Sequence, residues 1–255
     1  MLALERQNII LEKLREEKRV IVAELSRLFG VSEETVRRDL DKICQNGVAE
    51  KIYGGAVLNE NANVELPFNL RKMRNVREKR RIAALAADMV SDGEHVMLDA
   101  STTAVFVARA LKKKKDLTVV TNSLEVLIEL ADMTDWTVIS SGGALAGGAP
   151  ALLGPSALTS LAGYNADKLI FSCKGVHPDK GITDSSDAFS CVKQAMMAAS
   201  RVKILAADSS KFDRTAFSRI ADISAADIVV TDSPPGGAWL EVFQSRGVQC
   251  VYPEE

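Results

Sequence analysis

The sequence has few of the residues on which metal sites and many catalytic sites depend. It holds only two histidines and four cysteines in 255 residues. The cysteines show neither the paired spacing of metal ligands nor a disulfide framework: Cys44, Cys173, Cys191 and Cys250. His95 falls in an apolar strand pattern, which favours a packed core or edge position, and His177 falls in an expected loop. We therefore expect reduced thiols, no metal site, no bound cofactor and no histidine-based catalytic triad.

Long apolar runs are absent as well. No stretch approaches the ~20 apolar residues that a membrane helix requires. The N-terminus also lacks the basic, apolar and small-residue order of a secretion signal. These absences predict a cytoplasmic protein with no membrane partner. The net charge is only −2, and residues 1–55 carry equal numbers of basic and acidic side chains. Charge alone therefore does not indicate a nucleic-acid-binding protein.

The clearest pattern in the chain lies in residues 20–43, where two short helical segments are separated by Gly30-Val31-Ser32. Each segment has one apolar stripe at helical spacing: Val22, Leu25 and Leu28 in the first, and Val36, Leu40 and Ile43 in the second. Gly30 can end the first helix in the left-handed conformation, and Ser32 can cap the second. Val31 is placed to fill the gap between the two helices.

The second of these helices turns polar and basic side chains away from its apolar stripe: Ser32, Glu33, Thr35, Arg37 and Arg38. A tight turn followed by such a helix is the arrangement that lays a helix in the major groove of DNA. Arg37 and Arg38 suit phosphate or guanine contacts, and the two hydroxyl side chains suit bases or backbone. The simpler alternative is a helical hairpin whose arginines are only solvated.

The residues after the second helix predict a small β wing. Gly47 ends the helix, and two short apolar-polar runs then flank a turn at Tyr53-Gly54-Gly55, which we expect to lie at the DNA. A first helix over residues 3–17 has three apolar side chains facing inward: Ile10, Leu11 and Leu14. Together these elements predict a winged helix-turn-helix domain over residues 1–57.

Residues 58–75 show no clear periodicity, and we interpret them as a linker. A basic cluster in residues 71–81 either contacts DNA phosphates or begins a solvated helix. From residue 76 to 255, short apolar runs alternate with helical patterns. The predicted strands are 95–99, 117–120, 136–139, 168–171, 202–205, 228–230 and 248–251, and the predicted helices are 80–90, 102–111, 124–131, 155–162, 188–200 and 238–245. This alternation predicts an α/β domain, a mostly parallel sheet covered by helices on both faces.

Small, hydroxyl or charged residues follow five of the predicted strands. The segments are Asp99 to Thr103, Thr121 to Ser123, Ser140 to Gly143, Ser172 to Gly175 and Asp208 to Lys211. In open α/β sheets, ligands bind beyond the carboxyl ends of the strands. Any single segment of this kind could be only a helix cap, but five at one edge of a sheet indicate a binding site.

The residue types in these segments suit a small phosphorylated polyol. Ser101, Thr102 and Thr103 open a helix, where free N–H groups and the helix dipole attract a phosphate. Lys211 supplies a positive charge on a flexible stem. Further groups for the same ligand are the backbone N–H groups that Gly142 and Gly143 can present and the hydrogen-bonding side chains of Asp99 and Asn122.

Several motifs resemble those of the DeoR-type family of bacterial transcription regulators. The resemblance rests on E-R-Q-N-I-I-L-E-K-L, V-S-E-E-T-V-R-R-D-L-D-K-I and K-I-Y-G-G-A-V near the N-terminus, and on D-A-S-T-T, T-N-S, G-G and D-S-S-K-F further along. It covers nearly the whole chain. It implies an N-terminal domain that binds an operator in double-stranded DNA. It also implies a C-terminal domain that senses a phosphorylated sugar or related metabolite and has a fold related to ribose-5-phosphate isomerase and glucosamine-6-phosphate deaminase.

The resemblance also implies which residues line the effector pocket: Asp99, Ser101, Thr102, Thr103, Thr121, Asn122, Gly142, Gly143 and Lys211. Two departures from the family pattern are visible. Ala100-Ser101 stands where Ser-Gly is commoner, which reduces backbone freedom in the expected phosphate loop. Lys174 stands where a small residue is usual, and it either binds a second anionic group or points to solvent.

Two functions from different classes fit these observations. The first is a regulator, most often in this family a repressor of a sugar or polyol operon that is relieved by a phosphorylated sugar. The second is a sugar-phosphate isomerase with a DNA-binding head. The related isomerases have a lysine before the Gly-Gly loop, where this chain has Ser140 and Ser141. Asp184 and Asp187 could serve as a base but also look like a helix entry. We therefore expect no enzyme activity, and a homodimer or homotetramer that presents two heads to DNA.

Overall fold

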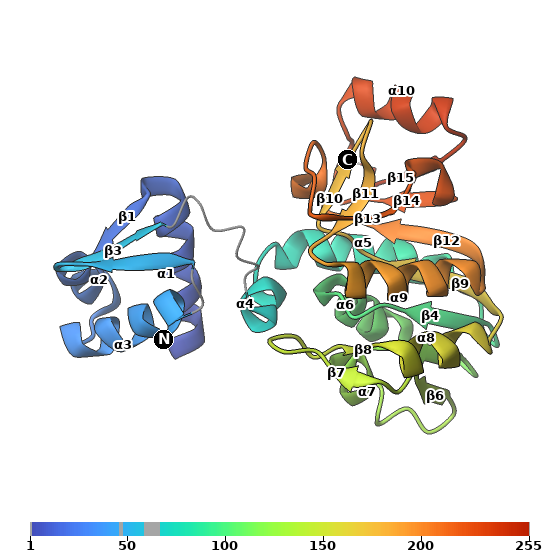
Figure 1. Ribbon diagram of the computed structural model, residues 1–255, viewed down its shortest axis with the longest axis horizontal. Coiled ribbons are helices and arrows are strands. Elements are labelled where there is room, and N and C mark those ends of the chain that lie inside the picture. Colours follow the sequence, from blue (N-terminus) through green and yellow to red (C-terminus); the bar gives the residue numbers. More distant parts are fainter. Residues whose placement is uncertain (1, 46–47, 59–66, 255) are drawn as a thin grey trace. The chain divides into compact units, whose positions relative to one another are not determined.

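The computed structural model describes residues 2–45, 48–58 and 67–254 (Figure 1). The chain divides into two compact units, Met1–Arg74 and Asn75–Glu255. Gly47, which we expected to end the second helix of the helix-turn-helix, and residues 59–66 of the predicted linker lie outside the described residues. Each unit has its own hydrophobic core, and each is described separately below.

The N-terminal unit is a winged helix-turn-helix, which confirms the prediction. Its elements are α1 (Ala3–Glu17), β1 (Arg19–Ile21), α2 (Val22–Phe29), α3 (Glu33–Gln45), β2 (Ala49–Ile52), β3 (Gly55–Leu58) and α4 (Phe68–Met73). The wing has three antiparallel strands in the order β1-β3-β2, and β1 is one strand more than we predicted. The core contains the expected apolar side chains of the three helices except Leu28, and Val31 packs against its margin.

Two expectations for this unit were wrong. Leu28, which we placed in the apolar stripe of α2, is 56 % exposed, because the helix buries only Val22 and Leu25 on that face. Residues 68–73, which we assigned to the linker, form helix α4. Leu70 of this helix is buried in the same core cluster as Ile10 and Leu14. Six residues are too few to show helical periodicity in the sequence.

The C-terminal unit is built on one seven-stranded parallel sheet in the order β15-β14-β12-β9-β4-β5-β6. The strands are β4 (His95–Leu98), β5 (Thr118–Thr121), β6 (Thr137–Ser140), β9 (Ala166–Phe171), β12 (Ser200–Ala206), β14 (Ile228–Val230) and β15 (Gln249–Val251). All seven were predicted. Val96, Met97 and Leu98 are all buried, although consecutive side chains of a strand point to opposite faces. Both faces of the sheet are therefore covered, as expected for parallel strands.

Six predicted helices cover this sheet: α5 (Val76–Asp88), α6 (Thr102–Leu111), α7 (Leu124–Glu129), α8 (Pro155–Ala162), α9 (Asp187–Ala198) and α10 (Gly237–Ser245). Helices α5 and α6 pack side by side, and so do α8 and α9 (Figure 1). Among the described residues, none of the helices is both long enough and apolar enough to cross a bilayer. The fold class of the whole chain is thus the one that the alternation of strands and helices predicted.

Several short elements were not predicted. A second, antiparallel sheet has the order β10-β11-β13 and consists of β10 (Gly175–His177), β11 (Gly181–Asp184) and β13 (Ser218–Ala221). A two-stranded ribbon joins β7 (Ala144–Leu145) to β8 (Leu152–Leu153), and two 3-10 helices are η1 (Ser209–Lys211) and η2 (Ile223–Ala225). His177, which we expected in a loop, instead ends strand β10. His95 begins strand β4, as the strand pattern predicted, but its side chain is exposed rather than packed, with its Nδ1 3.3 Å from Asp167 Oδ2.

Candidate functional site

The start of helix α3 is fixed by the turn that the sequence predicted. Gly30 has φ 63° and ψ 34°, and its N–H donates to the carbonyl oxygen of Ser26, which ends α2. Ser32 Oγ then accepts a hydrogen bond from the Thr35 N–H at 3.2 Å. This bond satisfies one of the free donors at the beginning of α3. The short turn sets the angle at which α3 leaves α2, and α3 is the helix that carries the predicted DNA contacts.

Both arginines of α3 are exposed, and each pairs with a glutamate one turn earlier. Arg37 Nη2 lies 2.7 Å from Glu33 Oε2, and Arg38 Nε lies 3.3 Å from Glu34 Oε1. Exposed pairs of this kind contribute only about 0.3–0.5 kcal/mol on a helix. Both guanidinium groups can therefore exchange their glutamate for a DNA phosphate or a base edge at little cost.

A buried carboxylate anchors the other face of α3 to α1, and the sequence analysis missed it. Asp39 is 3 % exposed, and it accepts a hydrogen bond from Arg6 Nε at 2.8 Å and from Gln7 Nε2 at 2.9 Å. The available signal was spacing, because Asp39 follows the buried Val36 by three residues and lies on the inward face of the helix. This network fixes α3 against α1 while the arginines remain outside.

The wing turn contains an exposed tyrosine followed by two glycines that have different roles. Tyr53 is fully exposed at the turn between β2 and β3, and Gly54 takes φ 78°. Gly55, by contrast, is buried, and a Cβ on it would lie 2.0 Å from the carbonyl oxygen of Val20 in β1. Of the three predicted wing residues, Gly55 therefore serves the pairing of the strands.

In the C-terminal unit, polar residues follow four neighbouring strands of the parallel sheet. Because the strands are parallel, their carboxyl ends lie at one edge. The residues are Asp99 after β4, Thr121 and Asn122 at the end of β5, Ser172 after β9 and Asp208 after β12. Gly142 and Gly143 follow β6 at the same edge and are exposed, with φ 63° and 110°. The sheet thus brings most of the predicted effector residues to one side of the unit.

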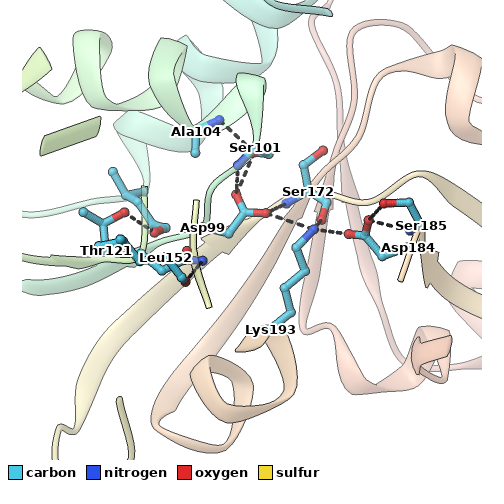
Figure 2. Close-up of polar contacts among 11 residues, drawn as sticks. Asp99, Ser101, Ala104, Thr121, Leu152, Ser172, Asp184, Ser185 and Lys193 are labelled. Carbon is cyan, nitrogen blue, oxygen red and sulfur yellow. Dashed lines mark hydrogen bonds and ion pairs between the residues drawn. The ribbon is translucent and has the colours of Figure 1, made fainter. Parts of the chain in front are cut away.

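Asp99 is the most enclosed of these residues. It is 1 % exposed and accepts hydrogen bonds from Ser101 Oγ at 2.6 Å and from the Ser172 N–H at 3.2 Å (Figure 2). Ser101 Oγ in turn accepts from the Ala104 N–H at 3.0 Å and caps helix α6. Thr102 and Thr103 are buried in the first turn of that helix. The carboxylate therefore holds the beginning of α6 in place.

Lys193 of helix α9, which the sequence analysis also missed, reaches this cluster from the opposite side. Its Nζ lies 3.1 Å from Asp99 Oδ2 and 2.6 Å from the Ser172 carbonyl oxygen, and it bonds Asp184 Oδ2 (Figure 2). Burial disfavours the charge on both partners, but their attraction outweighs it. The pKa of Asp184 is therefore held below its ordinary value and that of Lys193 above it.

The end of β5 is held by internal hydrogen bonds. Thr121 Oγ1 donates to the Leu98 carbonyl oxygen at 2.7 Å and accepts from the Ser123 N–H at 3.1 Å. Asn122 Nδ2 donates to the Leu152 carbonyl oxygen at 3.1 Å. Among the described residues, the buried Asn122 Oδ1 has no hydrogen-bond partner. The Asn122 side-chain oxygen is thus an unused acceptor, whereas the Thr121 hydroxyl already donates one hydrogen bond and accepts another.

The two lysines of the predicted site differ in their surroundings. The Lys174 N–H donates to the Thr183 carbonyl oxygen at 2.9 Å, and its side-chain charge helps to lower the pKa of Asp184. Lys211 is half-buried in η1, and within the described part of the chain its ammonium makes no hydrogen bond or ion pair. It lies close enough to Cys173 to act on that thiol, although burial still raises the thiol pKa to about 12.

A winged helix-turn-helix with outward arginines, joined to a parallel α/β unit with polar strand ends, defines a DNA-binding regulator with a separate sensor domain. The family description "DeoR-like helix-turn-helix domain" matches residues 6–62, and "DeoR C terminal sensor domain" matches residues 74–233. The chain belongs to the DeoR family of transcriptional regulators.

Related proteins match over nearly their full length. The regulator YulB of Bacillus subtilis is 38 % identical over 251 residues, which cover 98 % of this chain and 97 % of that protein. The glycerol-3-phosphate regulon repressor of Escherichia coli K12 is 31 % identical over 245 residues, 96 % of this chain and 97 % of that protein. Among solved structures, ribose 5-phosphate isomerase from Plasmodium falciparum aligns with a TM-score of 0.39 and 14 % identity, over 54 % of this chain and 52 % of that chain.

Proposed function

We propose that this protein represses a sugar or polyol operon and leaves its operator when a phosphorylated sugar or polyol binds the C-terminal unit. The main support is the topology of the parallel sheet. It gathers the polar ends of β12, β9, β4 and β5 at one edge, which is where ligands bind in open α/β sheets. A similar protein is named as the glycerol-3-phosphate regulon repressor. The effector is therefore expected to be a compact molecule with one phosphate and several hydroxyl groups.

The lysine of η1 is the proposed phosphate ligand. Lys211 is half-buried, and no other described group uses its ammonium, so an anion gains a charge partner without displacing one. The beginning of α6 offers free N–H groups at the same edge of the sheet. Asn122 Oδ1 remains as an acceptor for a hydroxyl group. Asp99 contributes indirectly, since its own oxygens are already occupied.

We further propose that the site binds without turnover. Isomerisation requires a base that is free to take a proton from carbon. Asp184, one of the two candidates that the sequence suggested, is 1 % exposed and bonded to Lys193, and its lowered pKa makes it a weak base. The alternative, a sugar-phosphate isomerase with a DNA-binding head, would require this ion pair to open. Turnover of ribose 5-phosphate by the purified protein, abolished by Asp184→Asn, would support the alternative and contradict the proposal.

On the DNA side, we propose that Ser32, Thr35, Arg37 and Arg38 contact the operator, together with Tyr53 and Gly54 at the wing turn. A homodimer or homotetramer in the cytoplasm would place two such heads on a repeated site, because one short helix offers few base contacts. Glu33 is proposed to aim Arg37 through the 2.7 Å pair rather than to bind DNA directly.

Thermal denaturation tests the effector proposal. Glycerol 3-phosphate and ribose 5-phosphate are added to the full-length protein, with glycerol and ribose as unphosphorylated controls. A ligand present at 100 times its Kd stabilises the native state by about 2.7 kcal/mol. The proposal expects a phosphorylated compound to raise the melting temperature and Lys211→Ala to remove the effect. Lys180→Ala, which removes an exposed lysine between β10 and β11, should leave it unchanged. An equal response of the Lys211 variant would show that this residue was misassigned.

A further inference from the structure

The buried ammonium of Lys193 has three oxygen partners. These are Asp99 Oδ2 at 3.1 Å, the Ser172 carbonyl oxygen at 2.6 Å and Asp184 Oδ2 (Figure 2). The contacts with Ser172 and Asp184 are hydrogen bonds, and the contact with Asp99 is an ion pair, so the buried ammonium is committed to groups within the protein. The role of Lys193 lies in the segments that it holds together.

The three partners come from three separate segments. Asp99 follows β4, Ser172 follows β9, and Asp184 ends β11 of the antiparallel sheet. Asp99 connects Lys193 to helix α6, because Ser101 Oγ donates to Asp99 and accepts from the Ala104 N–H at the beginning of α6. Within the part of the chain that the structure describes, Lys193 is thus the one side chain of α9 that contacts all three segments.

We infer that Lys193 is the positioning residue of the effector site: it holds the first turn of α6 and the Ser172 segment in the arrangement that binds the phosphorylated ligand. This inference rests on the proposed function, but it concerns a residue that does not touch the ligand. Asp99 is accordingly a structural intermediary in the site. Its carboxylate transmits the position of Lys193 to the capping hydroxyl of Ser101.

If Lys193 positions the site through its charge, its removal should make stability depend on pH, which the loss of packing alone would not do. Asp99 and Asp184 are both 1 % exposed and share one ammonium. The other charged groups that act on this cluster are Lys174, on Asp184, and Asp208 and Lys211, on the neighbouring thiol of Cys173. Without Lys193, two buried carboxylates face each other with only these more distant cations. One of the two must then take up a proton near neutral pH.

The sign of the resulting pH dependence follows from proton linkage. A carboxyl group whose folded-state pKa is raised binds more protons in the folded than in the unfolded state. Lys193→Met should therefore lose stability as the pH rises from about 5 to 8. The wild type should be flat there, because its pKa shifts fall outside this range. Lys193→Met combined with Asp184→Asn removes one charge of each sign and should restore most of the flat profile.

A matched control lies at the amino ends of the strands in the same sheet. Lys168, near the start of β9, is 14 % exposed at its side chain and lies 2.5 Å from Glu94 Oε2. Lys168→Met removes a half-buried lysine from a carboxylate without changing the strand ends that carry the site. The rate of amide exchange around Asp99 in this variant should match that of the wild type. So should the dependence of its melting temperature on pH between 5 and 8.

The experiment measures hydrogen–deuterium exchange and melting temperature on full-length protein at several pH values. Lys193→Met should increase amide exchange about tenfold in residues 99–104 and 172–174, and less in residues 228–230 of β14. Glycerol 3-phosphate binding should weaken about tenfold, which corresponds to about 1.4 kcal/mol. The charge-balanced double variant should fold and bind more tightly than the single variant.

Two outcomes would overturn the inference. One is unchanged exchange in residues 99–104 and 172–174 of either variant, and the other is a flat pH profile of Lys193→Met with exchange raised evenly through the sheet. If the single variant does not fold, an unchanged exchange pattern in the double variant still decides against it. Failure of the proposed function would look different. The exchange and pH results would hold, but the wild type would bind none of the phosphorylated compounds.

Discussion

At the scale of single residues, buried charges organise both units. Asp39 ties α3 to α1, and Lys193 ties α9 to the strand ends. A buried charge is stable only when partners surround it, so removing one member costs more than the pair contributes. On α3, the buried Asp39 and the exposed Arg37 and Arg38 lie on the same helix. One face of α3 is therefore fixed against α1, while the other face carries the proposed DNA contacts.

The acid stability of the C-terminal unit should depend on Asp184. Its pKa is lowered in the folded state, since Lys193 outweighs the effect of burial. Its contribution is therefore present above the unfolded pKa of about 3.9 and lost as the pH falls through the folded value. Urea denaturation between pH 2 and 7, followed by tryptophan fluorescence, measures this loss, because Trp136 and Trp239 both lie in this unit. The free energy of unfolding of Asp184→Asn should fall less steeply than that of the wild type as the pH is lowered. An equally steep fall would count against the ion pair.

Asp39→Ala should destabilise the N-terminal unit by about 3–5 kcal/mol, because the variant removes the buried carboxylate that pairs with the buried Arg6. Far-UV circular dichroism should show the loss of helix at lower urea, whereas tryptophan fluorescence should not move. Glu24→Ala, an exposed change on α2, is the control and should stay within about 0.5 kcal/mol of the wild type. Equal stability of the two variants would contradict the role given to the Asp39 network.

The limits of prediction from sequence are visible in these same residues. Lys193 and Asp39 were missed because a charged residue in a helix normally faces solvent. Spacing did carry the information, since Asp39 follows the buried Val36 by three residues and Lys193 precedes the buried Met196 by three. No sequence pattern shows, however, that Asp99 and Asp184 meet at one nitrogen. That contact depends on how β4, β11 and α9 assemble.

At the scale of elements, length and composition decided which parts could be predicted. The parallel strands contain short apolar runs, such as Val-Met-Leu in β4, Leu-Ile-Phe in β9 and Ile-Leu-Ala in β12, and such runs stand out in a sequence. Strands β10, β11 and β13 have three or four residues of mixed character and gave no clear signal. Their omission mattered, because Asp184 at the end of β11 is part of the buried cluster.

The wing provides a test at this scale. A Cβ on residue 55 would lie 2.0 Å from the Val20 carbonyl oxygen, so Gly55→Ala must separate β1 from β3. The cost should be about 1–3 kcal/mol of N-terminal stability, with weaker operator binding. Gly147→Ala, where an added Cβ meets nothing within 4 Å, should be neutral by urea denaturation. If Gly55→Ala were equally neutral, the close approach of the two strands would be disproved.

Helix α3 provides a second test. Arg37→Ala should reduce operator affinity by about 1–3 kcal/mol if the guanidinium contacts a base. If it contacts only phosphate, the salt slope should fall by about one instead. Arg219→Ala is the matched control, since it removes an exposed arginine paired with Asp222 in the other unit. Fluorescence anisotropy with a labelled promoter fragment measures both variants. Unchanged affinity and salt slope for Arg37→Ala would place α3 away from the DNA.

At the scale of the whole molecule, two units with separate cores share one chain, and regulation requires that binding to one changes the other. Such coupling between two sites typically amounts to about 1–3 kcal/mol. The effector must therefore favour one arrangement of the protein over another by that amount. Family membership establishes the regulator, and the geometry of the strand ends is the basis for proposing the ligand.

The most direct measurement is the affinity of the full-length protein for its own promoter region and for random duplex, by fluorescence anisotropy, with and without glycerol 3-phosphate or ribose 5-phosphate. We expect binding to the promoter at least about 10³-fold tighter than to random duplex. One phosphorylated compound should weaken that binding by about 5- to 150-fold. Equal affinity for both duplexes, unmoved by any phosphorylated compound tested, would contradict the account.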